Sequence, residues 1–499
     1  MHLKNLLPII SFSQGFRFIL FFFTSHRFLL FSKLISILNM TNLIKTKRGL
    51  DIHLSGKALE IIGKSLISDV IALVPDHYNG ITPKVVVKEG DVVKAGTPVF
   101  HDKNFSDMNF VAPVSGTILA VTRGDRRKVL SITIARDTEI TYEDFSIKAI
   151  SGLSGEEIKT QLLQAGLWPF IKQRPYDVIA NPAKAPKAIY ISTFDSAPLA
   201  PNYEFVLKGQ TADFQSGIDA LAKMTTGKVH LGIKAGSEST DFRSVKNVEI
   251  TEFSGPHPIG NVGIQIHHTN PVNKGEAVWT VNIQDVLFIG RFFNKGIVDL
   301  KRLVALTGPE VINPQYFPTI VGSNIQTVVK NSISNKTPLR FISGNVLSGL
   351  QVAPDGWLDP YASQITVIDE GSEIHELFGW AMPRIHKYSA SRLYFSGIIE
   401  SKLFQKIFGK INYEYDARVL GGKRAIIMSG EYDKVLPMDI LPEFLFKAMI
   451  AGNIDKIEVL GGYEIAPEDV ALCEFVCTSK LPLQQIVRDA LDNLKKEVE

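Results

Sequence analysis

The chain has 499 residues, of which 45% are hydrophobic and 21% charged, and its formal net charge is +3. At about 100–200 residues per domain, this length predicts about three or four globular domains. Because acids and bases nearly balance, the totals do not support the concentrated basic surface of a nucleic-acid-binding protein, and no nucleic-acid partner is expected.

Residues 1–39 differ in composition from the rest. No Asp or Glu precedes Asp51, and phenylalanine-rich patches alternate with basic residues. Arg17 and Arg27 interrupt the apolar run that a membrane-spanning helix needs, and no small-residue cleavage site ends the segment as it would end a signal peptide. We therefore interpret residues 1–39 as a non-native or unstructured extension with Met40 as the initiator, the alternative being a genuine targeting segment.

The chain contains two cysteines, Cys473 and Cys477. Two are too few for a disulfide framework in a chain of this length, which favours a reducing, cytoplasmic setting. Their spacing lacks the further ligands that a zinc or iron–sulfur site needs. We expect two buried structural thiols on one helical face and no metal.

Residues 40–145 are predicted to form a barrel-sandwich like that of biotinyl and lipoyl domains. Short β-branched runs alternate with Gly-Asp and Pro-x-x-Gly turns between Val85 and Val121, which indicates short antiparallel strands. Lys103 stands roughly where such domains carry their modified lysine. The insertion Asn104–Phe110 lengthens the hairpin that would present it, so we expect Lys103 to be unmodified.

Residues 146–300 are predicted to form a Rossmann-like α/β domain. A helix is expected around Gly155–Ala165, followed by a buried strand, Ile189–Thr193, that delivers Asp195 at its carboxyl end, where open α/β sheets bind ligands. A helix across Phe214–Met224 and a strand at Lys228–Ile233 then complete a parallel β-α-β unit. No G-x-G-x-x-G follows a strand here, which argues against nucleotide binding.

The segment Ser254–Val272 stands out because it combines three glycines with three prolines. This content predicts a shaped loop and not a helix, and such loops usually carry function. His257, His267 and His268 are imaginable zinc ligands. Adjacent histidines on an extended segment point to opposite faces, so hydrogen-bonded histidines at an interface are the preferred interpretation. A strand then passes into a helix near Asp285.

The last third of the chain is predicted to hold two smaller domains. Residues 301–377 show the order strand, strand, short helix, strand, which is typical of a β-grasp module, with a mixed α+β linker domain as the alternative. Residues 378–499 are expected to be mainly helical, because Leu441–Ala451, Pro467–Val476 and Leu483–Val498 carry helical periodicity.

Motifs spread over almost the whole chain after Met40 carry a family resemblance. Taken together they resemble the A subunit of the sodium-translocating NADH:quinone oxidoreductase, a respiratory membrane complex. The matching text comprises Lys47–Asp51, Lys88–Asp91, Gly166–Trp168, Arg174–Pro175, Phe194–Ala200, Ser254–Val272, Trp279, Gln284–Val286, Phe378–Trp380, Met438–Pro442 and Glu468–Cys477.

The resemblance implies a multidomain α/β and α+β protein: a lipoyl-like barrel-sandwich, a Rossmann-like domain akin to that of the flavin-carrying subunit of respiratory complex I, a β-grasp domain and a helical end. It implies a peripheral subunit on the cytoplasmic face of the bacterial inner membrane, held by partner subunits that include a membrane-embedded one. Within that complex, NADH oxidation by quinone drives sodium export. NADH, flavins and iron–sulfur centres are expected on the partners.

The residues also indicate what this subunit lacks. Where the complex I subunit has a glycine-rich flavin loop, Trp168 and Phe170 would obstruct a phosphate, so we predict no flavin. The related electron-transport subunits carry clusters of cysteines and this chain has two, so we also predict no iron–sulfur cluster and no redox step in the subunit, and we assign no catalytic residue. The family is associated with quinone binding at this subunit. The alternatives are a purely structural docking subunit without a ligand and, resting on Lys103 alone, a biotin or lipoyl carrier. The guesses for quinone contacts are His257, His267, Trp380 and Arg384.

Overall fold

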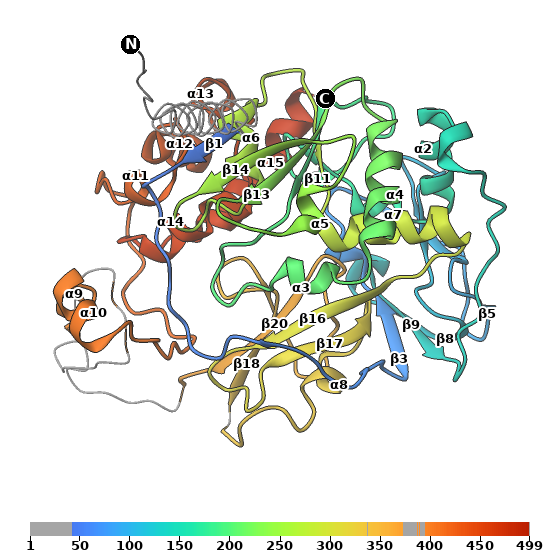
Figure 1. The fold of residues 1–499 in the computed structure, drawn as a ribbon, viewed down its shortest axis with the longest axis horizontal. Helices are drawn as coiled ribbons and strands as arrows, with labels where there is room; N and C mark the ends of the chain where they lie inside the picture. Colours follow the sequence, from blue (N-terminus) through green and yellow to red (C-terminus); the bar gives the residue numbers. More distant parts are fainter. Residues whose placement is uncertain (1–41, 337, 373–386, 388, 390–394, 499) are drawn as a thin grey trace, which may run out of the picture. The chain divides into compact units, whose positions relative to one another are not determined.

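The computed structural model describes residues 42–336, 338–372, 387, 389 and 395–498 (Figure 1). The chain divides into two units, Met1–Leu43 and Ile44–Glu499, and nearly all of the described residues belong to the second. The predicted extension, residues 1–39, lies outside the described residues. Across the described ranges no helix has the length and apolar character that crossing a membrane requires.

Two small antiparallel sheets form the first domain-sized region, as the short runs between turns predicted. Their strand orders are β3-β9-β8-β5 and β4-β6-β7. A side chain at Gly116 would lie 1.8 Å from the carbonyl oxygen of Ala135, so glycine permits the pairing of β8 with β9 there. The strands are β3 (Val70–Leu73), β4 (Pro83–Val85), β5 (Val92–Val93), β6 (Pro98–Asp102), β7 (Asn109–Val111), β8 (Gly116–Arg123) and β9 (Val129–Arg136).

Lys103 begins the connection between β6 and β7. Residues 103–108 separate the two strands, so the turn is longer than a two-residue hairpin. The Lys103 side chain is exposed, and its backbone N–H donates to the carbonyl oxygen of Thr82. That Lys103 stays unmodified remains a prediction.

A seven-stranded mixed sheet follows, in the order β1-β14-β13-β12-β15-β10-β11. Its strands β14, β13, β12 and β15 run parallel, which confirms the β-α-β prediction, while β10 pairs antiparallel with β11 and β15. The strands are β1 (Asn42–Lys45), β10 (Lys172–Arg174), β11 (Val178–Ile179), β12 (Ala188–Ser192), β13 (Val229–Lys234), β14 (Glu249–Ser254) and β15 (Val278–Thr280).

Helices α4 and α7 pack closely against each other beside this sheet (Figure 1). Two glycines allow the approach: a Cβ atom at Gly290 would lie 1.7 Å from the carbonyl oxygen of Asp213, and one at Gly217 would lie 2.3 Å from that of Val286. The helices of this region are α2 (Gly155–Gln164), η4 (Trp168–Phe170), α3 (Tyr203–Leu207), α4 (Thr211–Ala222), α5 (Thr240–Arg243), α6 (Val262–Thr269) and α7 (Ile283–Lys295).

Helix α6 corrects the prediction that Ser254–Val272 contains no helix. The prolines lie outside it, at 256, 258 and 271, so Val262–Thr269 has every backbone donor that a helix requires. Gly263 leaves room inside the helix for the Asp469 carboxylate. A Cβ atom at this position would lie 2.4 Å from one of its oxygens, so a larger residue would not fit. His267 and His268 therefore follow each other on a helix, and the expectation of an extended segment at these residues is wrong.

A six-stranded sheet forms the β-grasp-like region, in the order β19-β18-β20-β16-β17-β2. Its order along the chain, two strands, a short helix and a further strand, is the predicted one. Strand β2 (Leu59–Ile62) comes from the beginning of the chain and pairs parallel with β17. The other elements are β16 (Lys301–Thr307), β17 (Gln315–Ile320), α8 (Ile325–Val329), β18 (Leu339–Ser343), β19 (Leu350–Val352) and β20 (Gln364–Asp369).

A buried ion pair joins the seven-stranded α/β region to the β-grasp-like region. Arg302 at the start of β16 donates to Asp285 in the first turn of α7 at 2.6 Å, and both side chains are fully buried. The same guanidinium donates through Nη1 to the carbonyl oxygens of Pro360 and Ala362, so both terminal nitrogens have acceptors while the buried Nε has none.

The described part after residue 395 is mostly helical, as predicted. Cys473 and Cys477 are buried free thiols, and burial raises the pKa of Cys473. The helices are α9 (Ser396–Ile399), α10 (Lys402–Phe408), α11 (Tyr432–Val435), α12 (Pro442–Ile450), α13 (Ile454–Val459), η6 (Pro467–Val470), α14 (Ala471–Val476) and α15 (Leu483–Val498).

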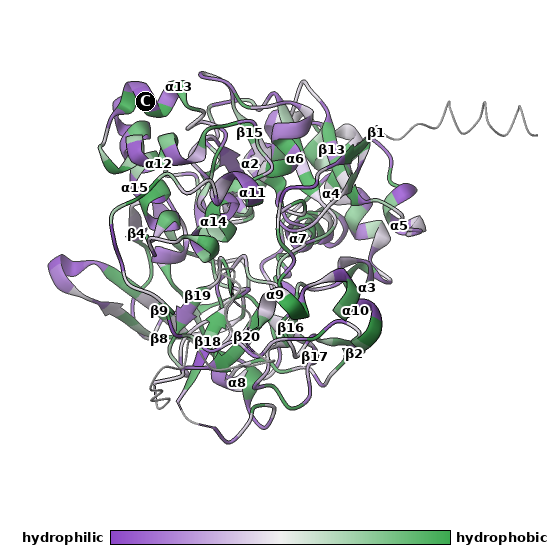
Figure 2. Ribbon diagram, turned by 90° about the vertical axis from the view of Figure 1, so that its left-hand side faces the viewer, coloured by the Kyte–Doolittle hydropathy of each residue, from purple (hydrophilic) through white to green (hydrophobic). Residues whose placement is uncertain are grey.

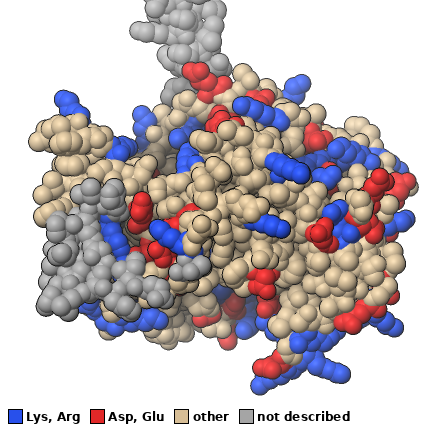
Figure 3. Space-filling view, turned by 90° about the horizontal axis from the view of Figure 1, so that it is seen from below, with Lys and Arg blue, Asp and Glu red and all other residues tan. Residues whose placement is uncertain are grey.

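Surface charge of both signs is mixed on the face drawn in Figure 3, where Lys and Arg side chains are interspersed with Asp and Glu. Among the described residues drawn on that face, the two signs of charge alternate and form no continuous basic stripe.

Candidate ligand site

The order of the parallel strands defines where a ligand site is expected. From β12 the chain adds β13 and then β14 on one side, and it returns to add β15 on the other side of β12. The connections after β12 and β15 therefore diverge. In an open α/β sheet the crevice at the carboxyl ends of two such strands is the usual ligand site.

A cleft of about 110 Å³ lies at this point. Ser192 ends β12 and Asp195 follows it, Thr280 ends β15 and Asn282 follows it, and His257 reaches the cleft from the loop after β14. Its remaining walls come from elsewhere in the chain, including Asn345 and Leu347 of the loop after β18, and Glu468 of η6. Three regions far apart in sequence thus enclose the cleft.

His257 is a buried polar residue of the cleft wall. Its side chain is 3% exposed, and its backbone N–H donates to Asp51 at 2.9 Å. Burial lowers the pKa of His257 to about 4, with the Asp51 carboxylate opposing this shift. The imidazole is therefore neutral near pH 7, with one ring nitrogen carrying hydrogen.

The hydrogen bonds around Ser196 assign that hydrogen. Ser196 Oγ accepts from the Gly260 N–H at 2.9 Å and lies 3.0 Å from His257 Nδ1. The arrangement that satisfies both groups has the Ser196 O–H donating to Nδ1, which places the imidazole hydrogen on Nε2. His257 Nε2 is buried and has no hydrogen-bond partner. It is a buried donor without a protein acceptor, on a residue that lines the cleft.

Asp195 confirms the prediction of a carboxylate at the carboxyl end of this strand. Its Oδ1 accepts from the Ala197 N–H at 2.8 Å. Burial raises the pKa of Asp195, opposed by the backbone hydrogen bonds from Ala197 and Ser196. The aromatic side chains of Phe194 and Tyr203 line the same cleft, so the site combines flat apolar walls with a few polar groups.

His267 differs from His257 because both of its ring nitrogens have protein partners. Nδ1 lies 2.7 Å from Glu464 Oε2, and Nε2 accepts from the Asp439 N–H at 2.9 Å. His267 thus connects α6 to the C-terminal helices and offers no nitrogen to a ligand. The other two predicted contacts, Trp380 and Arg384, lie outside the described residues.

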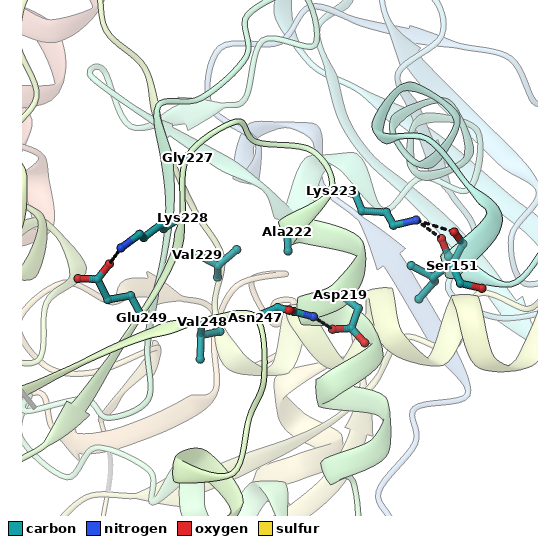
Figure 4. Close-up of a pocket in the computed structure, with 11 residues that line it drawn as sticks. Ser151, Asp219, Ala222, Lys223, Gly227, Lys228, Val229, Asn247, Val248 and Glu249 are labelled. Carbon is teal, nitrogen blue, oxygen red and sulfur yellow. Dashed lines mark hydrogen bonds and ion pairs between the residues drawn. The ribbon is translucent and has the colours of Figure 1, made fainter. Parts of the chain in front are cut away.

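A larger cavity, about 800 Å³, lies at the opposite edge of the sheet (Figure 4). Its polar groups are already paired: Lys228 with Glu249 at 2.7 Å, and Asn247 with Asp219 at 2.8 Å. The Lys223 ammonium donates to the carbonyl oxygens of Ile150, Ser151 and Leu153. Since Lys228 and Glu249 stand at the amino ends of β13 and β14, this is the edge that open α/β sheets do not use for ligands.

Within the described ranges no three His, Cys, Asp or Glu residues are grouped so that they could hold an ion. Tyr432 Oη lies 3.0 Å from the sulfur of Cys477, which places that thiol in a buried hydrogen bond.

Sequence comparison gives matches in three successive stretches. Residues 44–137 match the family described as the NqrA N-terminal barrel-sandwich hybrid domain, residues 153–298 the NqrA second alpha/beta domain, and residues 303–353 the NQRA C-terminal domain. The A subunit of the Na(+)-translocating NADH-quinone reductase of Neisseria meningitidis serogroup A is 37% identical over 459 residues, which cover 91% of this chain and 100% of that protein. The chain belongs to this family of A subunits.

Other members of the family show the same coverage. The proteins of Haemophilus influenzae strain PittGG and Pasteurella multocida strain Pm70 are 37% and 35% identical, again over 91% of this chain and 100% of each relative. Among solved structures, an NAD+-reducing [NiFe]-hydrogenase in the air-oxidized state aligns with a TM-score of 0.33 at 12% identity, over 71% of this chain and 66% of that one. Its H2-reduced form gives the same score and identity over 63% and 55%.

Sequence reasoning found His257 and Asp195 but missed the walls of the cleft. Asn345 and Leu347 line it from a segment that carries no motif of its own, and Glu468 lines it from the C-terminal region. Glu468 lies in the family-matching stretch Glu468–Cys477, but the resemblance did not predict that this residue belongs to the ligand site. A contact between residues more than a hundred positions apart leaves no local signal in one sequence.

Proposed function

We propose that this chain is the peripheral subunit of the respiratory complex that couples NADH oxidation by quinone to sodium export, and that it binds a quinone headgroup in the cleft beside His257. The complex would hold it on the cytoplasmic face of the bacterial inner membrane through partner subunits, including a membrane-embedded one. Family membership supports the assembly, and the unpaired Nε2 of His257 carries the ligand proposal.

The chemistry of the cleft suits a quinone ring. A quinone carbonyl oxygen is an acceptor, and His257 Nε2–H is a buried donor that needs one, because an unsatisfied buried donor costs free energy. Phe194 and Tyr203 offer aromatic surface to a flat ring. The cleft, at about 110 Å³, is smaller than the about 300–1,000 Å³ of most ligand pockets. It would therefore take the quinone headgroup and leave a long tail outside.

The redox groups are proposed to reside on the partner subunits. Iron–sulfur clusters need about four cysteine thiolates, and the chain has Cys473 and Cys477 alone, both buried. Trp168 and Phe170, which replace a glycine-rich flavin loop, are buried, and the Trp168 indole donates to the Ala180 carbonyl at 2.7 Å. A visible flavin spectrum or stoichiometric iron in the purified chain would refute this part of the proposal.

The test is titration of the purified full chain with a short-chain quinone analogue. We expect saturable binding that His257→Phe weakens by about tenfold, because one hydrogen bond is lost. His230 provides the matched control: its Nδ1 is also buried without a partner, yet His230 does not line the cleft, so His230→Phe should leave the dissociation constant unchanged.

Two outcomes would contradict the proposal. Absence of saturable binding at micromolar concentrations would favour the alternative of a purely structural docking subunit. Binding that His257→Phe leaves intact would place the quinone elsewhere, and Trp380→Ala and Arg384→Ala would then be the next variants to test.

A further inference from the structure

Helices α9 and α10 expose an unusual amount of apolar side chain. The exposed fractions are 60% for Ile398, 71% for Leu403, 63% for Ile407 and 68% for Phe408. The two helices lie beside each other at the left of Figure 1, and Figure 2 shows hydrophobic colouring on both. No residue of α10 is buried.

The apolar residues of α10 gather on one face. At about 100° per residue, Leu403, Phe404, Ile407 and Phe408 fall within an arc of about 140°, while Lys402, Gln405 and Lys406 occupy the opposite side. Phe404 and Phe408 also contact each other, with ring centroids 4.7 Å apart. A helix of this pattern normally turns its apolar stripe toward the protein core.

Glu400, between the two helices, ties the hairpin to the folded body. Gln405 donates to Glu400 at 3.1 Å, and the hydroxyl of Tyr413 donates to the same carboxylate at 2.5 Å. Tyr413 is 1% exposed and forms a bridge with Leu54, so its bond to Glu400 ties the hairpin to the folded body. The exposed fractions of Leu403, Ile407 and Phe408 place the apolar stripe at the surface.

Positive charge borders the apolar stripe. Lys402, Lys406 and Lys410 are exposed, and no Asp or Glu occurs from Ser401 to Tyr413. Lysine is depleted at protein–protein interfaces, whereas lysine beside exposed Phe and Leu is characteristic of helices that lie in the interface of an anionic bilayer. Charge and shape therefore favour lipid over a protein partner as the surface that covers this stripe.

We propose that the α9–α10 hairpin rests on the surface of an anionic lipid bilayer, with Ile398, Leu403, Ile407 and Phe408 entering the headgroup boundary and Lys402 and Lys406 contacting lipid phosphates. The protein would then touch the membrane directly, besides being held by its partners. This inference is independent of quinone binding, so either can fail without the other.

The test is co-sedimentation of the purified full chain with vesicles of phosphatidylglycerol and phosphatidylcholine in equal parts, compared with vesicles of phosphatidylcholine alone. We expect binding to the anionic vesicles that weakens as salt is raised. The double variant Leu403→Gln/Ile407→Gln should lower the partition coefficient by about tenfold or more. The double variant Lys402→Gln/Lys406→Gln should remove most of the preference for phosphatidylglycerol.

Val459→Gln is the matched control, because Val459 is 86% exposed on α13, away from the hairpin, and this variant should bind vesicles like the wild type. The proposal is overturned if the wild type does not sediment with anionic vesicles, or if the hairpin variants bind as well as Val459→Gln. It is also overturned if the hairpin variants lose assembly with the partner subunits while their vesicle binding is unchanged, since a protein would then cover the stripe.

Discussion

The guanidinium of Arg174 and the carboxylate of Asp469 form an ion pair of 2.8 Å in which both side chains are withdrawn from solvent, at 2% and 0% exposure. Arg174 ends β10 of the seven-stranded sheet, and Asp469 lies in η6 among the C-terminal helices. The second guanidinium nitrogen of Arg174 pairs with Glu468 at 2.7 Å. One arginine thus connects the sheet to a wall of the cleft.

Asp469→Ala should destabilise the protein by about 3–5 kcal/mol, because it leaves the Arg174 charge buried with one partner fewer. Urea unfolding measures the loss, and Asp455→Ala, at an exposed position on α13, serves as the control with a change of about 0.5 kcal/mol or less. The double variant Arg174→Met/Asp469→Met should recover part of the loss. Equal effects of Asp469→Ala and Asp455→Ala would show that the pair contributes nothing.

The buried imidazole of His257 predicts a pH dependence of stability. Its pKa is about 4 in the folded state and about 6.5 when unfolded, so between these values the unfolded state binds more protons. The contribution of His257 should therefore be neutral above about pH 6.5 and should cost the folded state up to about 3 kcal/mol as the pH falls toward 4. The unfolding free energy of His257→Phe, measured against wild type from pH 7 to 4, should fall less steeply. Parallel curves would rule out a depressed pKa.

Gly290→Ala should be strongly destabilising, by about 3 kcal/mol or more, because the new methyl group would meet the Asp213 carbonyl oxygen and push α7 away from α4. Gly152→Ala offers the comparison, since a Cβ atom there has no neighbour within 4 Å. Thermal unfolding of the two variants is sufficient to compare them. A small effect at Gly290 would mean that the two helices can separate at little cost.

His267→Gln should separate stability from ligand binding. Losing the bonds to Glu464 and to the Asp439 N–H should cost about 1–3 kcal/mol, because partly buried partners are left unsatisfied. The dissociation constant of the quinone analogue should stay that of the wild type, since His267 has no free ring nitrogen. Weaker binding of the analogue with unchanged stability would instead return His267 to the set of quinone contacts.

Local patterns predicted most of the fold. Strand β12 followed by Asp195, helix α4, and helices α12 and α15 were all indicated by periodicity and by the residues that bound them. Helix α6 was missed because the prolines on either side of it weighed more in the prediction than its uninterrupted interior. Strand β2 was not foreseen either, because Leu59–Ile62 acquires its strand conformation by pairing with β17, far along the chain.

The candidate site was only partly predictable for a related reason. His257 could be chosen from its loop, but the difference between His257 and His267 depends on which ring nitrogens find partners, and Ser196 and Glu464 supply those partners from distant positions. The buried pair of Arg302 and Asp285 is equally invisible in the sequence, where each residue is an ordinary charged residue.

Because Glu468 lines the cleft and also binds Arg174, a ligand that contacts Glu468 would link occupancy of the cleft to attachment of the C-terminal helices. A ligand that binds only when η6 is in place would stabilise the attachment of η6 to the sheet. A change that destabilises this attachment would weaken ligand binding by the same factor. Amide hydrogen exchange in η6 and α14 should therefore slow when a quinone analogue binds, and Asp469→Ala should raise the dissociation constant although Asp469 does not line the cleft. The stability of the C-terminal helices would in this way depend on whether the cleft holds a ligand.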